Sequence, residues 1–150
     1  MKDKEIIEKI SPVYFDKIMK GAEQKYNEAA IKAILPYLKG ENILELGCGE
    51  GIWTDVLIKI YRKVVVVDAS EYLLKHLKEK LGNAVECYNS LIEEFETDKN
   101  VDTILAAHIL EDVEDPVKVL AKATTWLSKN GQIIIVVPNA LSLHRIIGRL

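Results

Sequence analysis

The sequence predicts an α/β fold, a three-layer αβα domain with a mostly parallel sheet, and three observations support this prediction. Short apolar runs alternate along the chain with helix-length stretches, several of the runs are apolar on both faces, and one leads straight into a glycine-rich turn. Strands buried between two layers of helices have this character. With 150 residues, 49% of them hydrophobic, the chain is long enough to form one domain with a substantial core.

The first 40 residues are expected to form a helical segment ahead of the sheet. Its helical region extends from about Pro12 to Leu38 and is closed by Lys39-Gly40. Apolar positions give this region a face that can pack on the sheet, at Ala29, Ala30, Ala33, Ile34 and Leu38. Residues 41–150 are expected to form the α/β core.

Five short apolar runs in that core are predicted strands: Asn42–Leu46, Lys63–Val67, Ala84–Tyr88, Val101–Ala107 and Gln132–Val137. The predicted helices between them are Ile52–Tyr61, Glu71–Leu81 and Pro116–Leu127. Asp115 caps the last helix, Pro116 takes its first position, and Lys129-Asn130-Gly131 stops it before the next strand. This alternation of strand and helix favours a parallel sheet with right-handed crossovers.

The most informative segment is the turn after the first predicted strand, Gly47-Cys48-Gly49-Glu50-Gly51. A backbone that bends sharply beside a ligand needs residues without a Cβ. The next strand ends on Asp68, an acid that can reach a ribose. Because parallel strands end at the same edge of a sheet, these two features together predict a nucleoside pocket at that edge.

The spacing of the glycines distinguishes between kinds of ligand. A nicotinamide dinucleotide fold favours G-x-G-x-x-G, whereas this turn has the pattern G-x-G-x-G and Ile52 follows it. The sequence has no Gly-Lys-Ser/Thr phosphate loop. Glu45 would be unfavourable beside a pyrophosphate and favourable beside an ammonium or sulfonium group, which favours a cationic ligand. The alternative that the glycines only form a tight turn stays open.

Bulk properties exclude several classes of function. The formal net charge is −3, so we expect no nucleic-acid binding driven by a basic surface. No stretch resembles a signal peptide or reaches the length of a membrane span, so no membrane association is expected. Cys48 lies in the glycine turn and Cys87 at a strand end, which predicts neither a disulfide nor a metal site and favours a cytoplasmic location.

Four segments, in order along the chain, give the sequence a family resemblance. Ile43–Gly51, Val64–Ser70, Val101–Val113 and Leu127–Asn139 resemble successive motifs of the class I S-adenosylmethionine-dependent methyltransferases, particularly those with small-molecule substrates. The resemblance extends from about Pro12 to the last residue. It implies a Rossmann-like fold, S-adenosyl-L-methionine as cofactor, S-adenosyl-L-homocysteine as product and a small-molecule acceptor.

The resemblance also implies which residues bind the cofactor. Gly47 and Gly49 would line its methionine part, with Cys48 in the same turn and Glu45 nearby. Asp68 would accept hydrogen bonds from both ribose hydroxyls.

Three further positions are implied around the adenine, at Ala69, Ser90 and Leu91. The family commonly has an acid where this chain has Ser90, so that contact would come from the backbone or from the weaker hydroxyl. Ala107, which ends the fourth predicted strand, would offer its carbonyl oxygen to the ammonium group of the cofactor.

Methyl transfer from a sulfonium is an in-line displacement, so the protein chiefly aligns the reactants and excludes water. A base is needed only if the acceptor must lose a proton. His108, at the end of the fourth predicted strand, is the catalytic candidate, as a base or as a contact to cofactor or substrate; an orienting or packing histidine is the alternative. Tyr14 is either part of a lid or a packing aromatic, and Cys48 is not expected to act as a nucleophile.

The family normally continues past the fifth strand with a helix and a strand hairpin, whereas this sequence ends at Leu150. We expect the hairpin to be missing, which would leave an apolar strand edge. Either the chain is truncated from a longer enzyme, or another copy of the chain covers this edge. The second possibility predicts a homodimer through the fifth-strand edge or the C-terminal helix. Two alternatives to a methyltransferase remain: a non-catalytic fragment or partner subunit that binds the cofactor, and a disfavoured nicotinamide-dependent oxidoreductase.

Overall fold

The computed structural model describes residues 4–18 and 22–138 and contains a sheet of five parallel strands. The strands are β1 (Asn42–Leu46), β2 (Lys63–Asp68), β3 (Val85–Asn89), β4 (Val101–Ala107) and β5 (Leu127–Val136). Their order across the sheet is β3-β2-β1-β4-β5, so β1 lies between β2 and β4. The chain moves outward from β1 in one direction and then returns to its other side, which is the doubly wound arrangement expected from the alternating elements.

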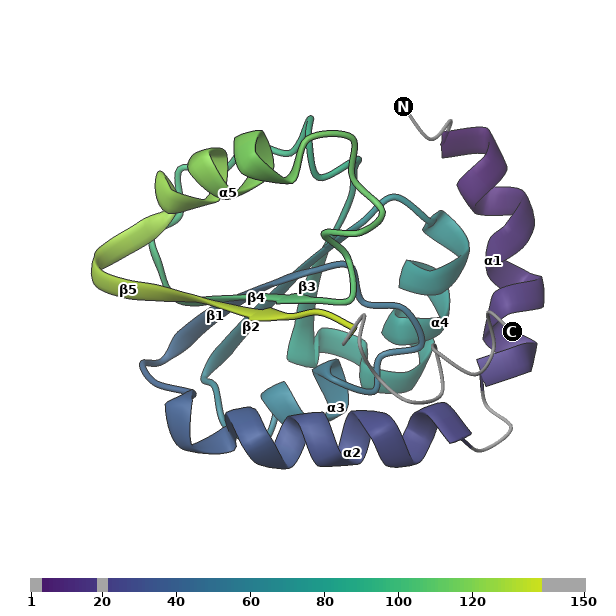
Figure 1. Cartoon of the computed structure of the whole chain (residues 1–150), viewed down its shortest axis with the longest axis horizontal. Helices are drawn as coiled ribbons and strands as arrows, with labels where there is room; N and C mark the ends of the chain where they lie inside the picture. Colours follow the sequence, from purple (N-terminus) through teal and green to yellow (C-terminus); the bar gives the residue numbers. More distant parts are fainter. Residues whose placement is uncertain (1–3, 19–21, 139–150) are drawn as a thin grey trace, which may run out of the picture.

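Helices cover both faces of this sheet (Figure 1). Their bounds are α1 (Lys4–Ile18), α2 (Ala22–Ile34), α3 (Thr54–Leu57), α4 (Glu71–Leu81) and α5 (Pro116–Thr124), with short 3-10 turns η1 (Leu35–Tyr37) and η2 (Gly82–Ala84). Helices α2, α3 and α4 lie on one face and α5 lies on the other, while α1 lies beside α4. The three-layer αβα prediction is therefore confirmed.

Alternate residues of each strand enter two separate cores, one on each face. Ile43 and Val66 pack with residues of α3 and α4, whereas Leu44 and Val65 pack with residues of α5. Successive side chains of a strand point to opposite faces, so strands that are apolar at every position bury both. The central strands lie in the molecule's interior for this reason.

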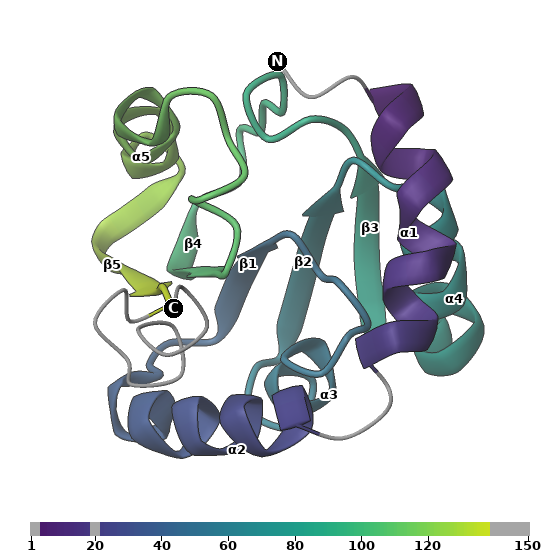
Figure 2. The same ribbon diagram turned by 45° about the vertical axis from the view of Figure 1, so that its right-hand side comes forward.

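The N-terminal segment differs from the prediction of a helical region starting near Pro12. Helix α1 begins at Lys4 and contains Pro12, and a second helix follows it. The early part of α1 makes a tertiary contact that local sequence does not reveal. Glu8 of α1 accepts a hydrogen bond of 2.8 Å from the backbone N–H of Tyr72, in the first turn of α4. Figure 2 shows α1 running alongside α4.

The predicted helix over residues 52–61 is much shorter in the structure. Only Thr54–Leu57 is regular α-helix, and turns flank it on both sides. Hydrogen bonds from Val56 to the Trp53 carbonyl and from Lys59 to the Val56 carbonyl span three residues rather than four. The stretch is rich in β-branched residues, which lose side-chain freedom in a helix and weaken it.

The boundary between the last helix and strand also differs from the prediction. Helix α5 ends at Thr124 rather than near residue 127, and Lys129-Asn130-Gly131 lies inside β5 instead of stopping the helix. Strand β5 pairs with Val101 at Leu127, and the register between the two strands shifts between Val101 and Thr103. This irregularity accommodates the extra residues, so a glycine that looks like a helix stop is part of a strand.

The remaining boundaries follow the predictions closely. Strands β1 and β4 and helix α4 have the predicted bounds, β2 extends by one residue to include Asp68, and β3 is shifted by one residue. Ser70 caps α4 by accepting a hydrogen bond of 3.2 Å from the N–H of Leu73. Among the described residues, no helix has the length and apolar character needed to cross a membrane.

Candidate cofactor site

The strand register brings the ends of β1, β2 and β4 together at one edge of the sheet. Leu46 is opposite Val67 of β2 on one side and Ala106 of β4 on the other. The residues that follow these positions are Gly47, Asp68 and Ala107, so three of the predicted site residues lie next to one another. In doubly wound sheets, ligands bind where the chain reverses direction across the sheet, which here lies between β1 and β4.

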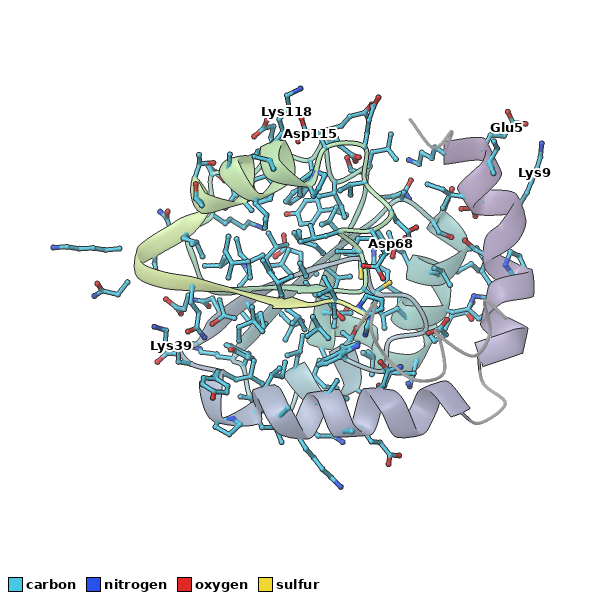
Figure 3. All side chains as sticks on the ribbon, viewed as in Figure 1. Glu5, Lys9, Lys39, Asp68, Asp115 and Lys118 are labelled. Carbon is cyan, nitrogen blue, oxygen red and sulfur yellow. The ribbon has the colours of Figure 1, made fainter. Side chains whose placement is uncertain are left out.

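Asp68 is held in place by backbone groups on both sides of its carboxylate. Oδ2 accepts from the N–H of Cys48 at 2.9 Å, and Oδ1 accepts from the N–H of Ser70 at 2.8 Å. The side chain is 8% exposed. In Figure 3 it lies inside the molecule, whereas Asp115 and Lys118 lie on the outer surface. The carboxylate is therefore preorganised at the end of β2.

The glycine turn bends because three of its residues adopt positive φ angles: 75° at Gly47, 48° at Gly49 and 77° at Gly51. The N–H of Gly47 donates to the carbonyl of Val67 at 2.8 Å, which joins the turn to β2. A Cβ on Gly47 would lie 2.9 Å from the side chain of Ile109. The close approach and the left-handed backbone both require glycine here.

Glu45 lies in the core beneath this turn and is 1% exposed. Its Oε2 accepts a hydrogen bond of 2.7 Å from Thr54 Oγ1, while Oε1 is buried without a hydrogen-bond partner among the described residues. Burial raises the pKa of Glu45 to about 8, against the opposing effect of the Thr54 hydrogen bond, and the negative charges of Asp68 and Asp55 add to the rise. A buried acceptor of this kind is suited to an incoming donor group.

The turn after β3 lies against the end of β2. The N–H of Ser90 donates to the Asp68 carbonyl at 3.0 Å. The amide of Asn89 donates to the carbonyls of Asp68 and Ala69, at 3.2 and 3.1 Å. The hydroxyl of Ser90 donates to the carbonyl of Leu91 at 2.9 Å. The predicted positions Ala69, Ser90 and Leu91 therefore form one connected border beside Asp68.

His108 follows Ala107 at the end of β4 and has a positive φ of 56°. Its backbone N–H donates to the carbonyl of Val136 at 2.8 Å, and its Nδ1 lies 3.7 Å from Glu111 Oε1. A non-glycine residue in the left-handed region is strained, and such strain concentrates at functional sites. The half-buried ring is thus held at the same edge as the glycine turn.

Cys48 has no features of a reactive thiol. Burial raises the pKa of its thiol, and the neighbouring carboxylate of Asp68 raises the pKa further. The thiol donates a hydrogen bond to Asp68 Oδ2 at 3.4 Å, so it stays protonated. A buried, protonated thiol is a poor nucleophile, so these features disfavour a nucleophilic role for Cys48.

Three residues of the site were not singled out from the sequence: Thr54, Ser70 and Asn89. Ser70 follows an acid and precedes a helical pattern, so its capping position could have been recognised. Thr54 is nine positions from Glu45, and no local pattern links the two residues. The predicted roles of Tyr14 depend on a side chain that lies outside the described residues, as does the predicted C-terminal helix.

Comparison with known proteins relates this chain to methyltransferases. A family model described as a methyltransferase domain matches residues 19–148. The chain is similar to a probable S-adenosylmethionine-dependent methyltransferase of Mycobacterium tuberculosis, at 22% identity over 116 residues that cover 77% of this chain and 42% of that protein. It is also similar to the ubiquinone biosynthesis O-methyltransferase of Rhodopseudomonas palustris, at 24% identity over 136 residues, with 89% and 53% covered. The chain thus spans about half the length of these relatives or less.

Solved structures share the fold. The N-methyltransferase NodS of Bradyrhizobium japonicum, in complex with S-adenosyl-L-homocysteine, has a TM-score of 0.74 at 17% identity, with 85% of this chain and 71% of that chain covered. Coclaurine N-methyltransferase, bound to N-methylheliamine and S-adenosyl-L-homocysteine, has a TM-score of 0.65 at 24% identity, with 71% and 34% covered. The chain belongs to the methyltransferase domain family and has the class I, Rossmann-like fold of S-adenosylmethionine-dependent methyltransferases.

Proposed function

We propose that this chain is a single S-adenosylmethionine-binding domain that transfers a methyl group to a small-molecule acceptor. The observation that carries the proposal is the carboxylate of Asp68, held by the N–H groups of Cys48 and Ser70 beside the glycine turn. A carboxylate has about four acceptor positions, and these two backbone donors use two of them. The thiol of Cys48 takes a third through a long hydrogen bond of 3.4 Å to Oδ2. One ribose hydroxyl would use the open position on Oδ1, and the other would replace the thiol on Oδ2.

The residues around Asp68 fit the rest of the cofactor. The glycine turn, with Gly47, Cys48 and Gly49, would take the methionine part beside Gly49, where nothing lies within 4 Å of a Cβ position, whereas Ile109 fills the space beside Gly47. Beneath it, the buried Oε1 of Glu45 suits a positively charged donor. Ala107 ends β4 next to this turn, where its carbonyl would accept from the ammonium group.

On the other side of Asp68, the border formed by Ala69, Ser90 and Leu91 would enclose the adenine. The hydroxyl of Ser90 already donates to Leu91. We therefore propose that recognition of the adenine amino group depends on backbone groups of this border. Apolar contact from Ala69 and Leu91 would complete it.

The cofactor, when bound, supplies an activated methyl group. The chain's own contribution is alignment and the exclusion of water, and good orientation lowers such a barrier by roughly 7–11 kcal/mol. We propose that His108, oriented beside Glu111, contacts the acceptor and takes its proton where one must be lost. His108→Gln should then lower kcat with little change in the dissociation constant for S-adenosyl-L-homocysteine, and an unchanged kcat would contradict this role.

The proposal of a small-molecule acceptor is supported by the names of relatives. One relative is an O-methyltransferase of ubiquinone biosynthesis, and one solved neighbour is an N-methyltransferase bound to N-methylheliamine. These differ in the atom that is methylated, so the proposal names the size class of the acceptor and no acceptor atom.

Calorimetric titration separates the possible functions. We expect heat on titration with S-adenosyl-L-homocysteine and none with NAD; the reverse would favour a nicotinamide-dependent oxidoreductase. Transfer of labelled methyl from S-adenosyl-L-methionine to small molecules of a cell extract then tests turnover. Binding without transfer would favour a non-catalytic module or partner subunit.

We further propose that the outer edge of β5 pairs with a second copy of this chain. Among the described strands, β5 pairs with β4 alone, and Ile135 and Val137 are 44% and 54% exposed. An apolar strand edge favours pairing. Light scattering of the wild type should give the mass of a dimer, and Ile135→Lys should lower the measured mass toward that of a monomer. A monodisperse monomer for the wild type would contradict the proposal. The alternative route through the C-terminal helix lies outside the described residues.

We also propose a cytoplasmic location, supported by the free thiols of Cys48 and Cys87. Cell fractionation tests it directly.

A further inference from the structure

Glu45 is an acidic side chain enclosed by the core. It follows Ile43 by two residues along β1, so its side chain lies on the same face of the sheet, which packs against α3 and α4. Thr54, its hydrogen-bond partner, is fully buried, and Thr54 Oγ1 lies 3.9 Å from the position of a Cβ on Gly51. The carboxyl group therefore lies directly beneath the glycine turn of the proposed cofactor site.

The hydrogen bonds of Glu45 stabilise an ionised carboxylate poorly. Oε2 receives a single neutral donor, the hydroxyl of Thr54, and Oε1 has no partner within the part of the chain that the structure describes. A buried charge is costly unless it is paired and hydrogen-bonded. In the absence of a ligand, the neutral carboxylic acid is therefore the favoured form.

The charges around Glu45 also favour its neutral form. Asp68 of β2 and Asp55 of α3 are both negative and oppose its ionisation. Within residues 4–18 and 22–138, the thiols of Cys48 and Cys87 also interact electrostatically with Glu45, and burial raises the pKa of each.

Among the described residues, no cation contributes to the pKa of Glu45. Helix α4 contributes Leu73, Leu74 and Leu77 to this core and β4 contributes Leu105, while Lys78 of α4 acts on Cys87.

We propose that Glu45 is a proton-linked switch for cofactor capture, which is neutral in the free domain and gives its proton to the solvent when a cationic ligand binds. This inference rests on the proposed function, since the cation is the ammonium group of the cofactor. The positive charge of the ammonium group at the turn above Glu45 would favour the ionised carboxylate, which stays enclosed at 1% exposure. Thr54 is the positioning residue that keeps Oε2 occupied in both states.

The proposal predicts how many protons are released on binding and how the affinity depends on pH. Because burial raises the pKa of Glu45 to about 8, the protonated form predominates at pH 7. Binding at pH 7 would therefore release up to one proton per ligand, and the release would fall as the pH rises through the pKa. Affinity would rise up to about tenfold per pH unit below pH 8 and then level off.

Calorimetry in buffers with different ionisation enthalpies measures this proton release. Titration with S-adenosyl-L-homocysteine at pH 6, 7 and 8 should give the release and the affinity profile described above. The control ligand is 5′-methylthioadenosine, which has the adenine and ribose but no ammonium group. It should bind through Asp68 without releasing a proton from Glu45.

Two variants assign the proton to Glu45. Glu45→Gln keeps an acceptor for Thr54 and should abolish the release and flatten the pH profile. Because titration of the ligand's own amine would persist in this variant, the difference from wild type isolates Glu45. Thr54→Val removes the hydrogen bond that lowers the pKa of Glu45, so the midpoint of the profile should move to higher pH.

Contrary outcomes are distinct for the two proposals. Binding of S-adenosyl-L-homocysteine without proton release, or equal release by wild type and Glu45→Gln, would overturn the switch and leave the cofactor site intact. If Glu45→Gln does not fold, an unshifted midpoint in Thr54→Val overturns it equally. Absence of binding at every pH would instead overturn the proposed function.

Discussion

The N–H of Cys48 donates a hydrogen bond of 2.9 Å to Asp68 Oδ2, and this contact joins the glycine turn after β1 to the end of β2. One carboxylate thus organises two segments that are 20 residues apart in the sequence. The N–H of Ser70 holds its other oxygen. The protein's own backbone groups therefore hold this part of the site in place, which reduces the ordering cost of binding.

Replacing Asp68 should weaken cofactor binding strongly. Asp68→Asn keeps one carbonyl acceptor and loses one charged hydrogen bond, worth about 1.5–3 kcal/mol, so the dissociation constant for S-adenosyl-L-homocysteine should rise roughly 10- to 150-fold. Asp68→Ala should weaken binding further. Calorimetry measures both, with the exposed Asp98→Asn as a matched control of equal charge change and circular dichroism as a check of folding. An unchanged dissociation constant would refute the ribose role.

Alanine at Gly47 and at Gly49 should have different effects on stability. Both positions have positive φ, which costs an alanine about 1–2 kcal/mol. At Gly47 the new Cβ would also meet Ile109 at 2.9 Å, whereas at Gly49 nothing lies within 4 Å. Urea unfolding should show the larger loss for Gly47→Ala. Part of that loss should be recovered in an Ile109→Ala background; equal losses at the two glycines would contradict the proposed contact.

Asp102 should stabilise the start of the sheet. Its Oδ2 accepts from the N–H groups of Glu41 and Asn42, at 2.8 and 3.0 Å, and these bonds lower its pKa. A lowered pKa gives stability that is present above the ordinary aspartate value and is lost as the pH falls through the lower value of the folded state. Asp102→Ala should lose about 1–3 kcal/mol at pH 7.

The measurement is urea unfolding of wild type and Asp102→Ala at pH 7 and at several pH values below 3.8, the ordinary aspartate value, with Asp98→Ala as the control. The difference between wild type and variant should shrink at the lower pH values. A difference that does not depend on pH would mean that the charge of Asp102 contributes nothing.

Glu45 should make the free domain less stable as the pH rises. Its pKa is raised to about 8 in the folded state, so the folded protein keeps a proton that the unfolded chain has lost. The resulting stability is fully present below the ordinary glutamate pKa and is lost as the pH rises toward 8, by roughly 1.4 kcal/mol per pH unit from this group. Glu45→Gln should remove this slope. Urea unfolding without ligand at pH 5, 6.5 and 8 tests it, and parallel curves for the two proteins would contradict it.

The sequence predicted those elements whose local pattern agrees with their tertiary setting. Helix α4 has the predicted bounds because its leucines lie at helical spacing and Ser70 caps it. Strands β1 and β4 are apolar on both faces and central in the sheet. The predicted end of α5 was wrong because Gly131 has the local character of a helix stop, while pairing of Leu127 with Val101 places it in a strand. The start of α1 was missed, and this part of the helix contacts α4 through Glu8, which no local pattern indicates.

The sequence by itself determined the chemistry at the strand ends: glycines that permit the turn, an acid after β2, and a glutamate two residues before the first glycine. These are local features, because backbone freedom and side-chain charge belong to single residues. The tertiary structure alone decided the pKa of Glu45 and the position of the Asp68 carboxylate. Glu45 is buried, and one of its oxygens bonds to Thr54, nine positions away, while the other has no partner in the part of the chain that the structure describes. The amide of Cys48 holds Asp68 in position. A pKa depends on which groups surround a residue in space, so the sequence alone could not predict it.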